Sequence, residues 1–435
     1  MNSVRSDSRE ERLPVVFFEK NRRKLAAMLP ERAVAVIFAG TPKTLSADVE
    51  YPFFANRNFY YLTGVEQEFS VLTLAKDGES LVATLFLLPC DPEKERWTGK
   101  RLTTAAAAEL SGITDIRLTA QAQDYWHELL EDSQRSFAYE EEDRAEAARK
   151  FGKLLLSQSR EMDIVSLSPL LTELRMVKES CEIEAIKKAI HLTEEAVRGM
   201  AVSVKPGVSE LELSAVFRYE MESRGCLQQA FPAIIAAGDH TLCLHHNTPS
   251  GYLQEGDLLQ LDVGGRVAGL CADISRSFPV GGHFTEKQRI LYNIVLACQR
   301  AAFDFIRPGV TIAEVNDKTC ETAYTLLCEV GLLPGERSGQ SGAEDIDDYY
   351  WHNVSHHMGH DVHDVAFREK PLSPGMVLTV EPGLYIPQWG FGIRIEDDVL
   401  VTQTGCEVLS VSFPREIDEM EAWVGESRTY AARNV

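Results

Sequence analysis

Four acidic residues in apolar segments are the residues best suited to chemistry in this sequence. Asp262 lies in the run LLQLDV and Asp273 in LCADISRSFPV, with a glycine-containing connection between the two. Glu381 lies in MVLTVEPGLYI and Glu396 in GIRIEDDVLV. A buried carboxylate without a partner is costly, and two that face each other also repel. Protons or cations must compensate these charges.

Each pair of acids is predicted to face across a β-hairpin. In registers centred on the two connections, Asp262 opposes Asp273 and Glu381 opposes Glu396. Directly opposed residues have Cβ atoms about 4.5–5.5 Å apart. Four carboxylates balance two divalent ions, and ions about 3.5–4 Å apart need bridging carboxylates. The alternative is two ordinary hairpins with solvent-facing acids.

Histidines concentrate just before the second predicted hairpin. Five of the eleven lie in the segment WHNVSHHMGHDVHD at 351–364. They are His352, His356, His357, His360 and His363. A neutral imidazole completes an oxygen-rich site and suits Mn, Fe, Co or Zn. His245 and His246 precede the first hairpin. For His246, His357 and His360 we expect a structural or surface role.

Other catalytic motifs are absent from the sequence. HNVSH lacks the Glu of the HExxH zinc motif. There is no P-loop, no Rossmann fingerprint and no GxSxG nucleophile elbow.

An internal sequence repeat places the two predicted hairpins at corresponding positions. KPGVSELEL at 205–213 resembles RPGVTIAEV at 307–315. Each Pro-Gly ends a helical segment, and Ser209 or Thr311 can cap the next helix. The pattern predicts a pseudo-symmetric domain, which favours the metal site over two unrelated hairpins.

The part before this repeat is typical of a mixed α/β domain. We expect helices over 19–29, 122–131 and 140–156, strands over 33–40, 59–64, 70–75 and 81–88, and a connection over 164–171. A boundary near residue 172 gives an N-terminal α/β domain over 1–172 and a catalytic domain over 173–435. Ser180 is expected to cap the first helix of the second domain.

The composition excludes several classes of partner. The chain has 435 residues, 44% of them hydrophobic and 25% charged, as in ordinary globular proteins. A net charge of −22 argues against nucleic acid and against an anionic membrane surface. No apolar run approaches the about 18 residues of a membrane helix, and residues 1–14 lack a signal-peptide core. Nine scattered cysteines without CxxC predict reduced thiols in a cytoplasmic protein.

At these residues the chain closely resembles aminopeptidase P, in the Xaa-Pro peptidase branch of the pita-bread metallopeptidases. The resemblance is carried by LHHNTPS at 244–250, LDVGGRVAGLCADISRSFPV at 261–280, HNVSHHMGHDVHDV at 352–365, LTVEPGLYIP at 378–387 and GIRIEDDVLVT at 392–402, with SADVEYPFFANRNFYYLTG at 46–64 and RWTGKRL at 96–102. It implies an α/β (α+β) protein with an N-terminal creatinase/prolidase-like α/β domain and a C-terminal pita-bread catalytic domain.

The resemblance implies a set of metal ligands: Asp262, Asp273, His356, Glu381 and Glu396. Asp273 and Glu396 would bridge two divalent ions, Asp262 would bind one, and His356 and Glu381 the other. Oxygen-rich ligation favours Mn(II), with Co, Fe and Zn as alternatives. The family's N-terminal domain often shapes the substrate site across an oligomer interface, so we expect a homo-oligomer, a dimer or a tetramer.

Further family residues fall on His245, His352, His363 and Arg394, and the alternative for Arg394 is a salt bridge to Asp397 or Asp398. The connection after EPGLYIP is shorter than in some bacterial relatives. His357 and His360 stand where apolar or aromatic residues are common, so the preferred substrate length stays open.

The mechanism expected from this resemblance is hydrolysis of peptides whose second residue is proline. Water bridging two ions would lose a proton near neutral pH, and the hydroxide would attack the carbonyl before proline. His245 or His363 would stabilise the oxyanion. Glu381 would pass a proton to the leaving proline nitrogen.

The proline ring must be recognised by shape, and His352 with Tyr349, Tyr350 and Trp351 could line its pocket. Prolidase, which cleaves only Xaa-Pro dipeptides, is the nearest alternative. A non-hydrolytic pita-bread peptide-binding module, a creatinase-like hydrolase and a methionine aminopeptidase are further alternatives. The complete acid set argues against the first two of these, and the N-terminal domain against the third.

Overall fold

The computed structural model describes residues 11–132, 134–140, 146–157, 163–334 and 346–424. The chain divides into two compact units, one formed by Arg12–Arg175 and the other containing the chain from Met176 onward. Among the described residues, no helix is both long enough and apolar enough to cross a bilayer.

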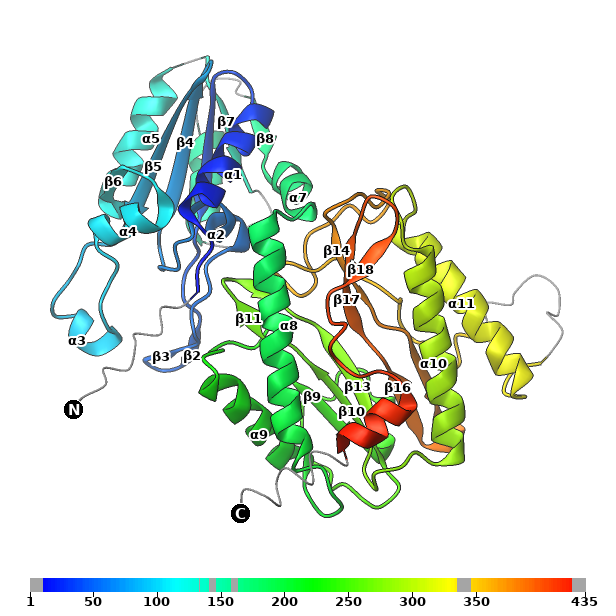
Figure 1. Cartoon of the computed structure of the whole chain (residues 1–435). Coiled ribbons are helices and arrows are strands. Elements are labelled where there is room, and N and C mark those ends of the chain that lie inside the picture. Colours follow the sequence, from blue (N-terminus) through cyan, green and yellow to red (C-terminus); the bar gives the residue numbers. More distant parts are fainter. Residues whose placement is uncertain (1–10, 133, 141–145, 158–162, 335–345, 425–435) are drawn as a thin grey trace, which may run out of the picture. The chain divides into compact units, whose positions relative to one another are not determined.

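The first unit is built on a six-stranded mixed sheet (Figure 1). Its strands, in spatial order, are β6 (Asp115–Leu118), β5 (Ser80–Leu87), β4 (Val71–Asp77), β1 (Ala33–Phe38), β7 (Ser136–Tyr139) and β8 (Ile164–Ser166). All six residues of β1 are buried, as the apolar run AVAVIF predicts for a central strand. The helices are α1 (Val15–Met28), α2 (Arg57–Thr63), α3 (Glu95–Thr98), α4 (Thr104–Ser111), α5 (Ala122–Glu131), α6 (Glu146–Leu156) and α7 (Ser168–Met176). The short strands β2 (Thr44–Ser46) and β3 (Val49–Glu50) form a separate pair.

Two expectations for the first unit are wrong. Residues 59–64 lie in α2 and its C-cap rather than in a strand, because Asn56 caps the amides of Asn58 and Phe59 and Gly64 closes the helix with φ 68°. Segment 164–171 contains β8 and the start of α7 rather than a connection.

The second unit contains two helix pairs that pack α8 (Ser180–Ala201) on α9 (Glu210–Ser223) and α10 (Glu286–Phe305) on α11 (Ile312–Glu329). Figure 1 shows the pairs flanking the strands of this unit. Ser209 and Thr311 cap α9 and α11 with matching capping boxes, which confirms the predicted caps of the internal repeat. The N-cap of α8 is Glu179, one residue before the expected Ser180.

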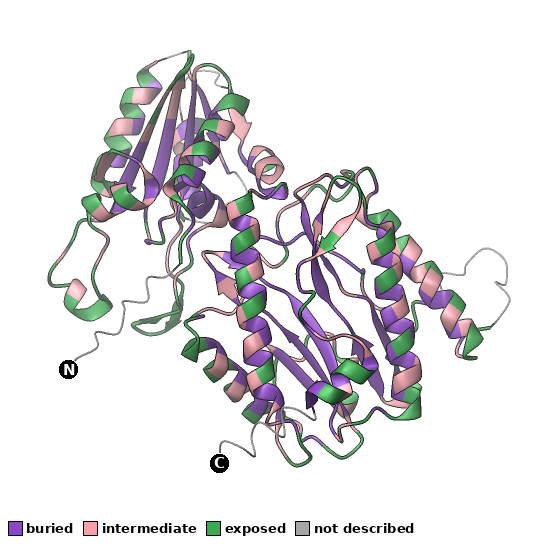
Figure 2. Cartoon of the chain, in the orientation of Figure 1, coloured by how far each residue is buried: buried purple, intermediate pink, exposed green. Residues whose placement is uncertain are grey.

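The strands of the second unit fall into corresponding sets. One set is β9 (Ile234–Ala237), β10 (Leu258–Val263), β11 (Arg266–Val267), β12 (Leu270–Cys271) and β13 (Ile274–Pro279). The other is β14 (Val377–Val380), β15 (Gly383–Ile386), β16 (Phe391–Arg394), β17 (Asp397–Val401) and β18 (Cys406–Val408). These strands are predominantly buried, whereas the helices alternate between buried and exposed residues (Figure 2).

The predicted register of the first hairpin is wrong by two residues. Asp262 pairs with Ser275, so Asp273 is its diagonal neighbour on the same side of the ladder. The reason is the turn, in which Ala268 and Gly269 both have positive φ, 50° and 83°. Two such residues make the tight hairpin turn that suits strand twist, and they move the centre of the hairpin by one residue.

The predicted register of the second hairpin is confirmed. β14 and β17 pair up to Val380 and Asp397, and β15 and β16 resume at Gly383 and Arg394. Glu381 therefore opposes Glu396 in the interval between the two ladders. The backbone N–H of Glu396 donates instead to Ser275 of the first hairpin, at 3.1 Å. The two hairpins thus meet at the acids.

Candidate metal centre

Three of the predicted ligands form a compact cluster. Ligand atoms of Asp273, His356 and Glu396 all lie within 4.8 Å of one another. Asp273 precedes β13, His356 lies in the loop before β14, and Glu396 lies between β16 and β17. Asp273 is more than 80 residues from the other two along the chain, yet His356 Nε2 lies 3.4 Å from Asp273 Oδ2.

The two remaining predicted ligands lie beside this cluster. Glu381 Oε1 is 3.5 Å from His356 Nε2 and accepts the hydroxyl of Thr379 at 3.4 Å. One oxygen of Asp262, Oδ2, accepts a hydrogen bond from Arg394. The other oxygen, Oδ1, is buried and has no hydrogen-bond partner among the described residues. A buried oxygen with free lone pairs is the feature expected of a cation ligand.

The electrostatics of the cluster are those of uncompensated negative charge. Burial raises the pKa of Asp273 well above its usual range, and the charges of Asp262, Asp398 and Glu381 raise it further. The pKa of Glu396 is raised by burial and then by the charges of Asp273, Glu381 and Asp262. Burial also raises the pKa of Glu381. Divalent cations would remove this repulsion.

The imidazole of His356 is oriented as a ligand. Its Nδ1 lies 3.1 Å from the carbonyl oxygen of His357, so this nitrogen carries the proton and donates it. The lone pair of Nε2 then points at the carboxylates of Asp273 and Glu381. A lone pair facing two acids is unfavourable unless a cation lies between them, so the residues fit a metal.

Arg394 is the one buried cation that the described residues place directly on the cluster. Its Nη2 donates to Asp262 at 2.7 Å, its Nη1 to the hydroxyl of Tyr385 at 2.8 Å, and its Nε to Ser275 Oγ at 3.0 Å. Ser275 in turn donates to Glu396 Oε2 at 2.7 Å. These bonds fix the orientation of Asp262 and Glu396.

The alternative partners considered for Arg394 are wrong. Asp397 is paired with Arg276 at 2.7 Å, and Asp398 accepts the backbone N–H of Asp273 at 3.1 Å. Asp397 and Asp398 directly follow Glu396 in the second hairpin. Their contacts with Arg276 and Asp273 join it to the first hairpin.

His352 is neutral and fixed beside Glu381. Its Nε2 lies 2.8 Å from the Tyr385 hydroxyl, and its Nδ1 is 3.7 Å from Glu381 Oε2. Burial and the charge of Arg394 lower its pKa to about 4. Trp351 stacks on Tyr385 with ring centroids 4.8 Å apart. This aromatic surface adjoins the acids.

Two of the aromatic residues predicted to line a proline pocket have other contacts. The hydroxyl of Tyr350 donates to Asn316 at 3.2 Å in the interior, and that of Tyr349 accepts from Gln388. Trp351 is therefore the predicted aromatic residue that adjoins the Tyr385 ring.

His245 and His363 lie at the exposed side of the cluster. The rings of His363 and His356 have centroids 4.2 Å apart. Burial lowers the pKa of His363, and the charges of His356 and His245 lower it further. Thr241, four residues before His245, accepts the backbone N–H of Gly392 at 2.9 Å, so the segment that carries His245 lies against β16.

The three histidines expected to be structural or on the surface are not alike. His357 and His360 are buried, and burial with the charge of Lys178 lowers the pKa of His357 to about 4. His246 is half-buried and its Nε2 lies 3.0 Å from Glu210.

Tyr385, Ser275 and Thr379 were not among the predicted site residues. Ser275 follows Asp273 by two residues, so strand alternation could have placed it on the same face. For Tyr385 the sequence signal is the pair of glycines that pack on it, Gly383 and Gly392. A Cβ at either glycine would lie within 2.6 Å of the Tyr385 ring or hydroxyl.

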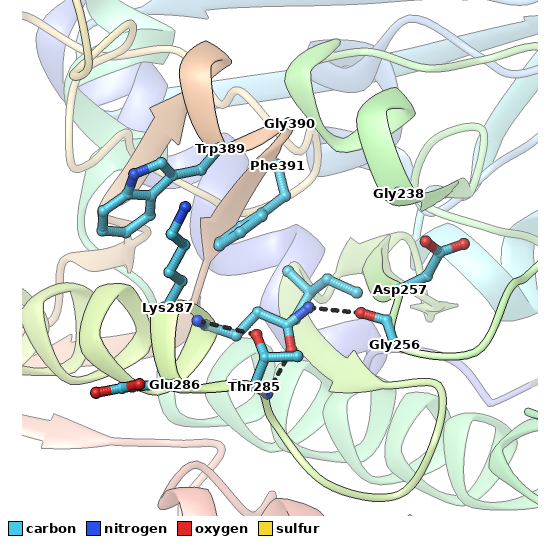
Figure 3. A pocket seen from close by; sticks show the side chains of 11 residues that line it. Gly238, Gly256, Asp257, Thr285, Glu286, Lys287, Trp389, Gly390 and Phe391 are labelled. Carbon is cyan, nitrogen blue, oxygen red and sulfur yellow. Dashed lines mark hydrogen bonds between the residues drawn. The ribbon is translucent and has the colours of Figure 1, made fainter.

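A separate cavity of about 420 Å³ lies at the N-terminus of α10 (Figure 3). Lys287, Trp389 and Phe391 line it, and Lys287 Nζ is 5.5 Å from the Trp389 ring centroid. None of the predicted site residues lines this cavity.

Family models match two parts of the chain. Residues 184–403 match metallopeptidase family M24, and residues 18–138 match the aminopeptidase P N-terminal domain.

Full-length relatives and solved structures agree with these matches. The Xaa-Pro aminopeptidase of Escherichia coli (strain K12) is 32% identical over 433 residues, which cover 94% of this chain and 98% of the relative. Xaa-Pro aminopeptidase 1 of Streptomyces coelicolor is 34% identical over an alignment that covers 93% of this chain and 86% of the relative. The structure of a putative aminopeptidase P from Bacillus anthracis superposes with a TM-score of 0.90 at 34% identity, over 95% of this chain and 99% of that chain. Aminopeptidase P from E. coli with the inhibitor Pro-Leu gives a TM-score of 0.90 at 30% identity, over 96% and 100%.

Proposed function

Because the chain belongs to metallopeptidase family M24 and carries the aminopeptidase P N-terminal domain, we propose that its acid cluster is the metal centre of an Xaa-Pro aminopeptidase. Such an enzyme releases the N-terminal residue from peptides with proline in the second position. The observation that carries the proposal is the convergence of Asp273, His356 and Glu396 within 4.8 Å, in a chain similar to Xaa-Pro aminopeptidases over 94% of its length.

We assign five ligands to two divalent ions. Asp273 and Glu396 would hold both ions, Asp262 would hold one of them, and His356 and Glu381 would hold the other. The buried Oδ1 of Asp262 and the Nε2 of His356 support this assignment, because both present lone pairs without a donor. Mn(II) is the proposed metal, since four carboxylates and one imidazole form an oxygen-rich set.

Divalent ions held there would lower the pKa of a bound water and polarise the scissile carbonyl. Glu381 accepts a proton and passes it to the leaving proline nitrogen, and the burial that raises its pKa suits this exchange. His245 and His363, at the exposed side of the cluster, donate to the developing oxyanion.

Arg394 and His352 keep this apparatus aligned through Tyr385. The Tyr385 hydroxyl accepts from Arg394 and donates to His352 Nε2, both at 2.8 Å. Because the pKa of His352 is about 4, its ring carries no positive charge near pH 7 and would not repel bound metal ions. The adjoining Trp351 and Tyr385 rings offer an apolar surface to the proline ring.

We also propose a cytoplasmic homo-oligomer, a dimer or tetramer. The scattered cysteines suit a reducing compartment. The acidic composition, with a net charge of −22, suits peptide substrates better than nucleic acid.

The test is cleavage of an Xaa-Pro-Xaa tripeptide and an Xaa-Pro dipeptide by the protein loaded with Mn(II), Co(II), Fe(II) or Zn(II). We expect release of the first residue from the tripeptide, with Mn(II) the most active metal, and no activity after chelation. Cleavage of the dipeptide alone would show a prolidase, and metal binding without cleavage of either peptide would show a binding module.

A further inference from the structure

A second buried carboxylate in the same unit is surrounded by hydrogen-bond donors. Glu210 is the first residue of α9 and its side chain is fully buried. Its two oxygens accept N–H groups from one connected segment, residues 237–251, which begins at the last residue of β9. The donors are the backbone amides of Ala237, Ser250 and Gly251, each at 2.8 Å, His240 Nδ1 at 2.8 Å and His246 Nε2 at 3.0 Å.

This arrangement leaves no position for a metal ion. Glu210, His240 and His246 satisfy the spacing of a metal site. A carboxylate offers about four lone-pair positions, however, and five donors occupy them. Burial opposes the charge of Glu210, but the amides of Gly251 and Ala237 and the ring of His240 nevertheless bring its pKa to about 2. The carboxylate is an anchor for N–H groups.

The segment fastened in this way carries His245. The segment runs from Ala237 to Gly251. The Glu210 backbone N–H also donates to the Gly251 carbonyl at 3.0 Å. Within it, Thr241 Oγ1 accepts the backbone N–H of Gly392 in β16 at 2.9 Å. The hydrogen bonds that hold the segment therefore lie both before and after His245, whose own side chain is exposed.

The packing at the anchor is close. A Cβ at Gly251 would lie 3.0 Å from Glu210 Oε1 and 3.0 Å from the His240 ring. The His240 and His246 rings lie 4.4 Å apart and tilted by 31°. The segment consequently has little freedom at either end.

We propose that Glu210 is a positioning residue for the reaction, which fastens both ends of segment 238–250 and thereby holds His245 beside His352 and His363. The inference rests on the proposed function, in which His245 donates to the oxyanion. A donor that is fixed before the substrate arrives requires no ordering during the reaction, and misplacement by about 1 Å can cost up to about 100-fold in rate.

The principal test compares Glu210→Gln with Glu212→Gln, an exposed residue on the same helix, by steady-state kinetics on an Xaa-Pro-Xaa tripeptide with Mn(II). We expect Glu210→Gln to lower kcat by about 10- to 100-fold, with KM changed less than about threefold and the metal content unchanged. Glu212→Gln should match the wild type. In a His245→Ala background, Glu210→Gln should cost less than about twofold, because both changes remove the same contribution.

Amide hydrogen exchange supplies a readout besides activity. The Ala237, Ser250 and Gly251 amides should exchange faster in Glu210→Gln than in Glu212→Gln, with α10 unaffected. If Glu210→Gln does not fold, His246→Ala carries the same test, with an expected kcat loss of about 3- to 10-fold that also disappears in the His245→Ala background.

The outcomes separate the two proposals. A wild type that does not cleave the tripeptide overturns the proposed function. An active wild type overturns the inference if Glu210→Gln, or His246→Ala in its place, behaves like Glu212→Gln. The same conclusion follows if the loss persists at full size in the His245→Ala background, since Glu210 would then be a general structural residue.

Discussion

Glu210 and the acid cluster, both buried in the second unit, have opposite surroundings. Glu210 accepts five N–H groups, and its pKa is about 2 in spite of burial. In the acid cluster, Asp273 and Glu396 are raised in pKa by burial and by neighbouring acids. Glu210 is thus stable as an anion within the folded chain, whereas the cluster needs charge from outside it.

The difference separates a structural use of buried charge from a chemical one. Donors around Glu210 occupy its lone pairs, so it can fasten a segment but cannot bind a ligand. Among the described residues, the cluster receives one cationic side chain, Arg394 on Asp262, and Asp262 Oδ1 has no hydrogen-bond partner. The incomplete compensation of the cluster is what allows it to bind divalent cations.

The largest effect is expected for Glu381→Gln. The amide keeps the size of the side chain but cannot accept and return a proton, so kcat on an Xaa-Pro-Xaa peptide should fall by about 10³- to 10⁴-fold. The control is Glu286→Gln, an exposed residue at the cavity of Figure 3. Circular dichroism should show the same fold for both. Retention of activity within tenfold would contradict the catalytic role of Glu381.

The next effect concerns Arg394, the buried cation that contacts Asp262. Arg394→Met leaves the buried carboxylate of Asp262 without its partner, so the free energy of unfolding of the metal-free protein should fall by about 3–5 kcal/mol. Arg289→Met, which removes the ion pairs to Glu421 and Asp418 from a side chain that is 42% exposed, should cost at most about 1 kcal/mol. Chemical denaturation measures both values, and equal losses would show that the cluster is not electrostatically distinct.

Metal removal should reverse the pH dependence of the cluster but not that of Glu210. Asp273, Glu381 and Glu396 have raised pKa values, so the folded metal-free protein binds more protons than the unfolded chain. Its stability should therefore fall as pH rises from about 4 through the raised values. Glu210, with a pKa of about 2, contributes stability above about 4.3 that is lost as pH falls towards 2.

Melting temperatures from pH 4 to 8, with chelator and with Mn(II), test this prediction. Metal at about 100 times its Kd should add about 2.7 kcal/mol, and the gain should be larger at pH 8 than at pH 5. Identical pH profiles with and without metal would exclude the acid cluster as the binding site.

The smallest effects distinguish the Glu210 carboxylate from the helix that carries it. Ser209→Ala and Thr311→Ala each remove an equivalent N-cap, so each should cost about 1 kcal/mol of unfolding free energy. Neither should change kcat. If Ser209→Ala alone lowered kcat, the N-terminus of α9 rather than the Glu210 side chain would control His245.

Sequence reasoning succeeded where local pattern determines structure. The Pro-Gly turns with Ser209 and Thr311 identified the two repeated helices, and the resemblance to aminopeptidase P is confirmed by the family matches. It failed for 59–64, where the apolar aromatic run suggested a strand but the Asn56 cap and Gly64 produce a helix. It also missed the turn at Ala268–Gly269, which shifts the first hairpin.

The residue types available for chemistry can be read from the amino-acid sequence: acids within apolar strands, a histidine-rich segment before the second hairpin, and a repeat that doubles the arrangement. Which carboxylates are compensated depends on how the folded chain packs around them. Glu210 and Glu381 are both acids near histidines, yet one is surrounded by amides from segment 237–251 and the other faces His356 and lies among further acids. The physical reason is that hydrogen-bond donors reach a buried oxygen from segments far apart in the chain, so their number depends on packing and not on local sequence.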